Sequence, residues 1–97
     1  MRYEIEFAAE AAQDYRELDA HVRGGVRDAI ETHLRHQPTK TGKSRIKRLR
    51  ALSRPQYRLR VGDIRVFYDV TELTVQVLAI VAKAHPQEWL ERSGEKS

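Results

Sequence analysis

Apolar and polar residues alternate along residues 57–68, and the alternation is interrupted at Gly62-Asp63. This pattern predicts two half-buried strands joined by a two-residue hairpin turn, because glycine supplies the positive φ that such turns require. In this register Val61 faces Ile64. The next pairs outward from the turn are Arg60 with Arg65, Leu59 with Val66 and Arg58 with Phe67. The apolar face then consists of Tyr57, Leu59, Val61, Ile64, Val66 and Tyr68. The opposite face consists of Arg58, Arg60, Arg65 and Phe67.

Two arginines, Arg60 and Arg65, lie directly opposite each other in this register. Like charges in opposed positions of a sheet repel, at a cost of up to about 1 kcal/mol. The fold has no need of this arrangement, whereas an anionic partner with phosphate or carboxylate groups would neutralise it. The hairpin therefore indicates an anion-binding surface, which becomes the centre of the candidate site.

The first part of the chain predicts a strand followed by two helices. Apolar and charged residues alternate over residues 2–7, which is typical of a half-buried strand. Over residues 8–18 the apolar positions change to a helical stripe. Asp19 is the expected N-cap of a second helix, which runs from about residue 21 to residue 36 and ends before Gln37-Pro38. The short connection predicts an antiparallel pair of helices laid on the sheet.

The second part of the chain adds a loop, a strand and a short helix to the hairpin. Residues 39–50 are expected to form a polar and then basic loop. Residues 75–82 are apolar on both faces, which favours a strand inside the sheet over one at its edge. Pro86 suits the first turn of a terminal helix that continues over residues 87–92. Residues 93–97 are expected to form a frayed tail.

Together these elements predict an α+β fold in one domain over residues 1–92. The expected order is an N-terminal strand, an antiparallel helical hairpin, a three-stranded β-meander and a short C-terminal helix. The helices are expected on one face of a curved sheet. The other face is expected to be open and to carry Arg58, Arg60 and Arg65.

Charge is distributed unevenly along the 97 residues, whose formal net charge is +4. Residues 1–42 carry a net charge of −2, residues 43–65 carry +8, and residues 66–97 carry −2. A basic block between two acidic ones is typical of a surface that binds a polyanion such as nucleic acid. The chain has no cysteine, no apolar run of membrane-spanning length and no signal-peptide pattern. We therefore expect a cytoplasmic protein without membrane contact.

Other kinds of site find little support in the sequence. His33 and His36 are spaced i, i+3 on a helix but lack a nearby glutamate-rich motif, so surface or interface histidines are favoured over metal ligands. Gly-rich phosphate loops, Cys-X-X-Cys pairs and nucleophile elbows do not occur. The basic block contains one carboxylate, Asp63, and it falls in the predicted turn. We expect neither a metal nor a cofactor.

The segment Tyr-Arg-Leu-Arg-Val-Gly-Asp-Ile-Arg-Val-Phe-Tyr-Asp, residues 57–69, resembles the central hairpin of RelE/ParE-type toxins of bacterial type II toxin–antitoxin systems. The resemblance extends over most of the chain and includes the first strand, the helical hairpin, the basic segment ending in Lys47-Arg48-Leu49 and the apolar last strand. It implies a RelE/ParE-like fold. The density of positive charge on the hairpin favours the RelE-like branch.

In the RelE branch the resemblance implies a ribosome-dependent endonuclease that inhibits translation by cutting mRNA in the ribosomal A site. The 2′-hydroxyl of the message attacks the adjacent phosphate, and basic side chains stabilise the charge that develops. Carried over by position, the catalytic candidates are Arg58, Arg60, Arg65, Lys83 and His85. Further nucleic-acid contacts are expected from Lys43, Arg45, Lys47, Arg48, Arg50, Arg54 and Phe67.

The end of the last strand departs from the RelE pattern. An arginine just after that strand and a tyrosine in the C-terminal segment correspond here to Ala84 and Leu90. Lys83 or His85 is the expected substitute, and His85 titrates close enough to neutrality to act as the general acid. The alternative is that His85 merely caps the last helix.

Three functions remain open at this stage. The first is the mRNA interferase, with the ribosome and mRNA as partners. The second is a ParE-like inhibitor of DNA gyrase without nuclease chemistry, which the altered family positions favour. The third is a relative with weak or lost toxicity that binds an antitoxin. In each case the resemblance implies a cognate antitoxin, whose acidic residues would meet Arg58, Arg60 or Arg65, and contact with operator DNA only through that antitoxin.

Overall fold

A computed structural model of the protein describes residues 2–42, 45–50, 52–82, 90–92 and 94–96. Its elements are β1 (Glu4–Phe7), α1 (Ala9–Glu17), α2 (Ala20–Ala29), η1 (Ile30–Leu34), β2 (Ile46–Arg48), β3 (Leu52–Arg54), β4 (Tyr57–Val61), β5 (Ile64–Thr71), β6 (Thr74–Ala82) and β7 (Glu95–Lys96). η1 is a short π-helical segment that continues α2, and residues 90–92 form a helical turn. The predicted α+β class is confirmed. The expected beginning of the C-terminal helix at Pro86 lies outside the described residues.

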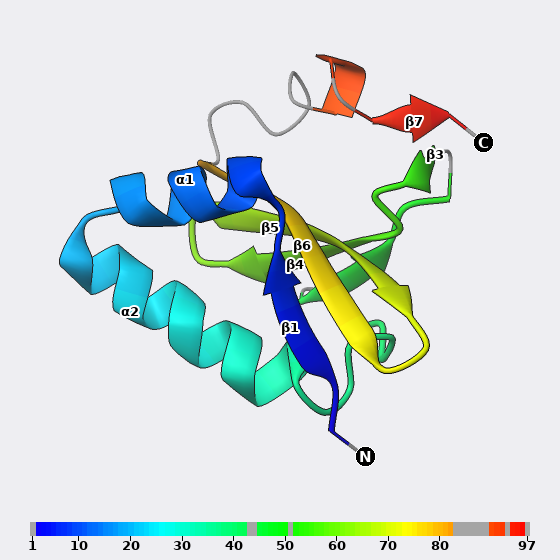
Figure 1. The fold of residues 1–97 in the computed structure, drawn as a ribbon, viewed down its shortest axis with the longest axis horizontal. Helices are drawn as coiled ribbons and strands as arrows, with labels where there is room; N and C mark the ends of the chain where they lie inside the picture. Colours follow the sequence, from blue (N-terminus) through cyan, green and yellow to red (C-terminus); the bar gives the residue numbers. More distant parts are fainter. Residues whose placement is uncertain (1, 43–44, 51, 83–89, 93, 97) are drawn as a thin grey trace.

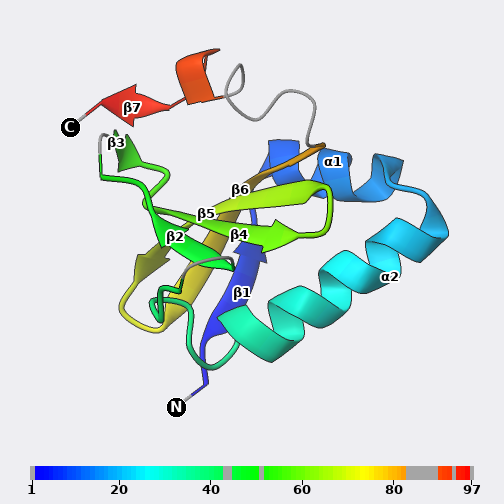
Figure 2. The same cartoon turned by 180° about the vertical axis from the view of Figure 1, so that it is seen from behind.

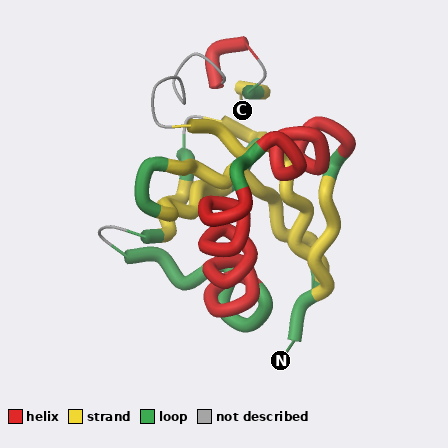
Figure 3. The backbone as a smooth tube through the Cα atoms, turned by 90° about the vertical axis from the view of Figure 1, so that its left-hand side faces the viewer, coloured by secondary structure: helices red, strands yellow, loops and turns green. Residues whose placement is uncertain are grey.

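The main sheet has five strands in the order β1-β6-β5-β4-β2. β6 lies between β1 and β5, so the prediction of an interior last strand is confirmed. β1 runs parallel to β6, and the consecutive strands β4, β5 and β6 form the predicted antiparallel meander. Both α1 and α2 lie on one side of this sheet (Figures 1 and 3). None of the helices that the structure describes has the length and apolar character needed to cross a membrane.

The central hairpin has the predicted register. Val61 pairs with Ile64, and Arg60 pairs with Arg65. Gly62 has a φ of +57°, in the left-handed region that the turn requires. The side chains predicted to be apolar and inward-facing all belong to the main core or pack against it.

The main core lies between the helices and the sheet. Val26, Ile30 and Leu34 recur at helical spacing and are at most 3% exposed. Asp19 caps α2 as predicted, since its side chain accepts a hydrogen bond from the Val22 N–H at 3.0 Å. Asp14 of α1 accepts a bond from the Ile80 N–H at 2.9 Å, and burial raises the pKa of this carboxyl. This bond attaches α1 to β6 at a point beyond the end of β1.

An irregularity in the pairing of β5 with β6 creates a second, smaller cluster on the opposite face of the sheet. Phe67 pairs with Ala79, but Tyr68 pairs with Val77, so the register passes over Leu78. A bulge of this kind turns neighbouring side chains to the same face. Phe67 and Ala79 are buried there, and the partly buried residues packed against them are Leu49, Leu78, Val81 and Leu90. The expectation that this face is open is wrong for the part that the cluster covers.

Two segments form more regular structure than the sequence suggested. β2 replaces part of the expected basic loop and pairs with β4, because Ile46 packs into the core while Lys47 stays exposed. β3 and β7 form a separate two-stranded sheet, so Glu95 and Lys96 are paired where a frayed tail was expected (Figures 1 and 2).

Two adjacent glycines, Gly24 and Gly25, lie within α2. A Cβ atom on Gly25 would meet nothing within 4 Å, so close packing does not require this glycine. Gly25→Ala is therefore expected to raise the free energy of unfolding by about 0.5–1 kcal/mol, because alanine loses less backbone entropy on forming a helix. Urea unfolding followed by circular dichroism measures the change. Gly62→Ala is the matched control and should lower stability by about 1 kcal/mol, because its φ is positive. A loss of stability in Gly25→Ala would contradict the prediction.

Candidate functional site

Four basic residues on the described strands of the main sheet lie on the face that points away from the helices. In the observed register Lys47 pairs with Arg58, and Arg60 pairs with Arg65. Partners directly opposite each other on neighbouring strands share a face. We call this group, Lys47, Arg58, Arg60 and Arg65, the cationic hairpin patch. The three arginines that the sequence placed together are therefore on one surface.

Arg58 occupies an unfavourable position in the patch. Its Nε is buried and has no hydrogen-bond partner among the described residues. Burial lowers the pKa of the Arg58 guanidinium from its ordinary value, and the positive charges of Arg65 and Arg60 lower it further. A buried donor without a partner costs about 1–3 kcal/mol. A bound anion would remove both the unsatisfied donor and the charge repulsion.

The other two arginines are held differently. The Arg65 Nη1 donates to the carbonyl oxygens of Gly62 at 3.0 Å and of Ile64 at 3.2 Å, so the side chain is folded against the turn. The remaining nitrogens of its guanidinium carry further donors, which suit a phosphate or a carboxylate. Arg60 is exposed. The patch thus combines one arginine that is partly buried, one that is braced and one in solvent.

The remaining basic candidates lie in different surroundings. Arg45 and Arg50 are exposed, like Lys47 in the patch. Arg48 lies 5.2 Å from the centre of the Tyr57 ring and donates to the Gln56 carbonyl oxygen, on the opposite face of the sheet from Arg58. Lys43, Lys83, Ala84 and His85 lie outside the described residues.

Arg54 belongs to a partly buried network that the sequence did not reveal. Its Nε donates to the Asp69 carboxylate at 2.8 Å, and Asp69 is 7% exposed. The other Asp69 oxygen accepts from the Gln56 N–H at 2.7 Å, while the Gln56 side chain accepts from the Val70 N–H at 2.9 Å. The network fixes the segment that leads into β4 and thereby sets the position of the strand that carries Arg58. Asp69 falls at an outward position of an alternating strand, where a polar residue is ordinary. The sequence pattern therefore gave no sign of this network.

Phe67 does not have the role expected from the sequence. Its side chain is 1% exposed, so its ring is not available to stack on a base. Leu90, which the resemblance aligned with a tyrosine of RelE-type toxins, is half-buried and packs against the same cluster. In this structure Leu90 therefore contributes packing.

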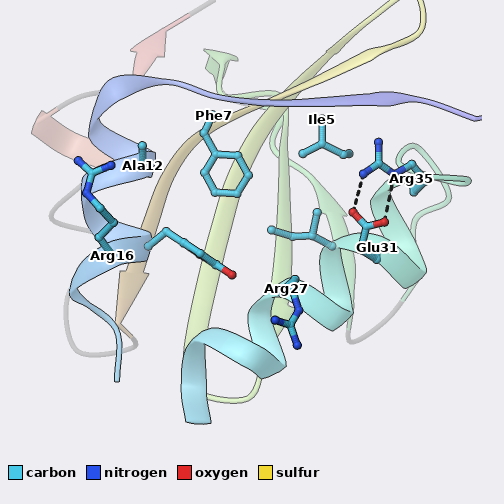
Figure 4. Close-up of a pocket in the computed structure, with 9 residues that line it drawn as sticks. Ile5, Phe7, Ala12, Arg16, Arg27, Glu31 and Arg35 are labelled. Carbon is cyan, nitrogen blue, oxygen red and sulfur yellow. Dashed lines mark hydrogen bonds and ion pairs between the residues drawn. The ribbon is translucent and has the colours of Figure 1, made fainter. Parts of the chain in front are cut away.

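A separate groove of about 410 Å³ lies between β1 and the helices (Figure 4). Phe7 and Tyr15 meet there edge to face, with ring centres 5.6 Å apart. Arg35 closes one end, where its Nη2 lies 2.6 Å from Glu31, and this contact lowers the pKa of the Glu31 carboxyl. The groove is lined by Ile5, Phe7, Ala12, Tyr15, Arg16, Arg27, Ile30, Glu31 and Arg35. It therefore has apolar walls and several cationic groups.

The structure gives no support to a metal site within its described part. No group of three or more histidine, aspartate or glutamate side chains converges there. His33 is half-buried, whereas His36 is exposed. Burial lowers the pKa of His33, and the neighbouring charge of Arg45 lowers it further.

The fold agrees with what comparison with known proteins finds. Residues 5–85 match the family described as the ParE toxin of the type II toxin–antitoxin system, parDE. The chain therefore belongs to the ParE toxin family of type II toxin–antitoxin systems. This confirms the RelE/ParE resemblance seen in the hairpin. A search of curated proteins gives no match.

Solved structures with the same fold come from several organisms. The toxin–antitoxin complex RelBE2 from Mycobacterium tuberculosis superposes with a TM-score of 0.73 at 21% identity, over 84% of this chain and 99% of that one. The RelB-RelE antitoxin-toxin complex from Methanococcus jannaschii gives 0.67 at 20% identity, over 87% and 96%. The YoeB dimer from Staphylococcus aureus gives 0.62 at 20% identity, over 88% and 99%. At these identities the likeness establishes the fold.

Proposed function

We propose that this toxin stops growth by binding a phosphate of ribosome-bound mRNA at the cationic hairpin patch and cleaving the message there. The observation that carries the proposal is the buried, unpartnered Nε of Arg58, flanked by two further arginines. A fold gains nothing from three repelling cations, whereas a site for a phosphodiester that gains negative charge as the 2′-oxygen attacks does.

The proposed reaction needs charge stabilisation more than it needs a protein nucleophile. The 2′-oxygen forms a bond to the adjacent phosphorus and loses its proton to solvent. The bond to the 5′-oxygen breaks, which leaves a 2′,3′-cyclic phosphate and a 5′-hydroxyl. Arginine does not act as the base, because its pKa stays above about 12. Its guanidinium instead binds the phosphate oxygens as negative charge accumulates on them. His85 is the candidate that protonates the 5′-oxygen.

Primer extension on a reporter mRNA tests the proposal directly. The protein is induced alone in cells that translate the reporter, beside Arg65→Ala and the control Arg27→Ala, whose side chain is exposed on α2. Breaks within codons are expected for the wild type and for Arg27→Ala. They should fall by about 10²- to 10³-fold in Arg65→Ala, which lacks one charge-stabilising donor. Growth arrest without breaks would overturn the nuclease.

A second candidate function is inhibition of DNA gyrase. The position of Leu90 favours it, because an apolar side chain that packs against Phe67 supplies no group for proton transfer. In this function the patch would contact the enzyme or its DNA and no bond would be broken. Growth arrest with induction of the DNA-damage response, and an intact reporter mRNA, would support it. Absence of any arrest would support a relative whose patch chiefly binds an antitoxin.

We also propose that the partner is a cognate antitoxin, and that one of its segments occupies the groove between β1 and the helices. The groove offers aromatic and aliphatic walls, which suit a segment with apolar side chains at regular spacing. Arg16 and Arg27 would pair with acidic residues on the same segment, whereas Arg35 is already paired with Glu31. Acidic residues elsewhere on the antitoxin would neutralise the patch. The proposed location of the pair is the cytoplasm.

A further inference from the structure

A second cavity, of about 320 Å³, lies between η1 and β2, the strand at one edge of the main sheet. His33 lines it from η1, and Ile46 lines it from β2. The loop between these elements supplies the remaining wall, with Gln37, Lys40 and Thr41. The cavity is separate from the groove beside β1, since the two have no lining residue in common.

The described part of the loop that walls this cavity, residues 37–42, is held at two points. The Tyr68 hydroxyl donates to the Pro38 carbonyl oxygen at 2.6 Å, and both residues are buried. Burial raises the pKa of Tyr68, so this hydroxyl stays protonated and remains a donor. Further along, the Gly42 N–H donates to the Ile46 carbonyl oxygen at 3.0 Å. The cavity therefore has a frame that does not have to be ordered by a ligand, which reduces the entropic cost of binding.

Among the described residues, the charged and titratable groups that line the cavity are cationic or neutral. Lys40 comes from the loop, Arg45 comes from the segment before β2, and His33 comes from η1. The nearby Arg45 disfavours the charged form of His33 and lowers its pKa, in addition to the effect of burial. Gln37 and Thr41 add neutral hydrogen-bond donors. The carbonyl oxygens of His33 and Gln37 accept bonds from Gln37 and Lys40, so the end of the helix adds little free negative charge.

We propose that this cavity is a binding site for a phosphate group, distinct from the cationic hairpin patch. Two cations and two neutral donors around a preformed hollow match the several acceptor oxygens of a phosphate. The phosphate belongs either to a small nucleotide or to the backbone of an RNA strand. The site does not depend on which target the toxin attacks.

His33 provides a direct readout, because a bound anion favours the charged imidazole and raises its pKa. NMR titration of the histidine side chains of the full chain is carried out in sodium chloride and in sodium phosphate at equal ionic strength. Phosphate is expected to raise the pKa of His33 in a saturable manner. The exposed His21 and His36 serve as internal controls and should not respond. Equal responses of all three would indicate general screening and would overturn the site.

Two variants and one control locate the binding. Lys40→Gln and Arg45→Gln are each expected to weaken phosphate binding about tenfold, because each removes a charge-assisted hydrogen bond. Arg27→Gln, in the other groove, should leave the binding unchanged. An unaltered response in both Lys40→Gln and Arg45→Gln would refute the proposal.

The source of the phosphate is decided by two further probes. Adenosine 5′-monophosphate tests a small nucleotide, and a short oligoribonucleotide without terminal phosphates tests the RNA backbone. Saturation of the His33 response at a lower concentration of the oligoribonucleotide would assign the site to RNA. Saturation by the mononucleotide alone would assign it to a small ligand. No response to either probe or to phosphate would overturn the site.

Discussion

Replacing Arg58 with leucine is expected to abolish growth arrest and, at the same time, to make the fold more stable. The toxic activity is lost because the guanidinium is the group held ready for the anion of the target. Stability rises because the variant removes a buried Nε without a partner and two repulsive contacts, with Arg60 and Arg65. Opposite effects on activity and stability are typical of residues whose placement serves function.

The expected magnitudes make the two effects separable. Loss of one preorganised donor to a transition-state charge lowers activity by about 10²- to 10³-fold. Relief of like-charge contacts and of a buried donor raises the free energy of unfolding by about 1 kcal/mol. Growth after induction gives the first quantity, and urea unfolding of the purified chain gives the second. Primer extension then shows whether the lost activity is mRNA cleavage.

Arg27→Leu is the matched control for this variant. Arg27 is basic and exposed, and it lies on α2, on the other side of the sheet from the patch. Its replacement should leave growth arrest unchanged and alter stability by less than about 0.5 kcal/mol. An Arg58→Leu protein that remains toxic, or that unfolds more easily than the wild type, would show that Arg58 is a structural residue.

The register of the central hairpin could be predicted because its information is local. Gly62-Asp63 sets the turn, and once the turn is placed every pair from Val61–Ile64 outward follows. The same reasoning put Arg60 opposite Arg65 and placed the arginines on one face. Asp19 as a helix cap is a second local signal, and it was also correct.

The features that escaped prediction depend on contacts between distant segments. In the sequence, the bulge at Leu78 is visible only as a strand that is apolar on both faces. The burial of Phe67 also depends on Leu49 and Leu90, which come from other parts of the chain. Likewise, β2 appears as strand because β4 is there to pair with it. Alternation along one segment carries no information about which neighbour will cover it.

In the candidate site too, the features set by local sequence were predicted and the features set by distant contacts were not. Charge and position of the three arginines could be read from the hairpin alone. The burial of the Arg58 Nε could not, because the exposure of a single atom depends on the segments that pack around it, and the sequence of the hairpin does not say which segments these are. The sequence also did not show that Arg54 is held in an ion pair, because its partner Asp69 lies fifteen positions along the chain.

Phe67→Ala is expected to lower the free energy of unfolding by about 3 kcal/mol. The ring is 1% exposed and forms the centre of the second cluster, so its removal leaves a cavity beneath Leu90 and beside Ala79. Truncation of a buried phenylalanine costs about 3–5 kcal/mol, and the lower value suits a cluster in which Leu49, Leu78, Val81 and Leu90 are only partly buried. Phe7→Ala is the control, because Phe7 is 36% exposed and should cost about 1 kcal/mol. Urea unfolding of the purified variants measures both changes.

Phe67→Leu separates the packing role from a role in stacking on a base. Leucine keeps an apolar side chain in the cluster, so the variant should lose only about 1 kcal/mol of stability and keep the growth arrest of the wild type. If the ring instead stacked on RNA, leucine would abolish the arrest while leaving the fold intact. Because the cluster and the cationic hairpin patch share a face, with Phe67 paired to Arg58, the first result would mean that the apolar cluster supports the strands beneath the arginines. Binding of the target would then rest on charge alone at this part of the surface.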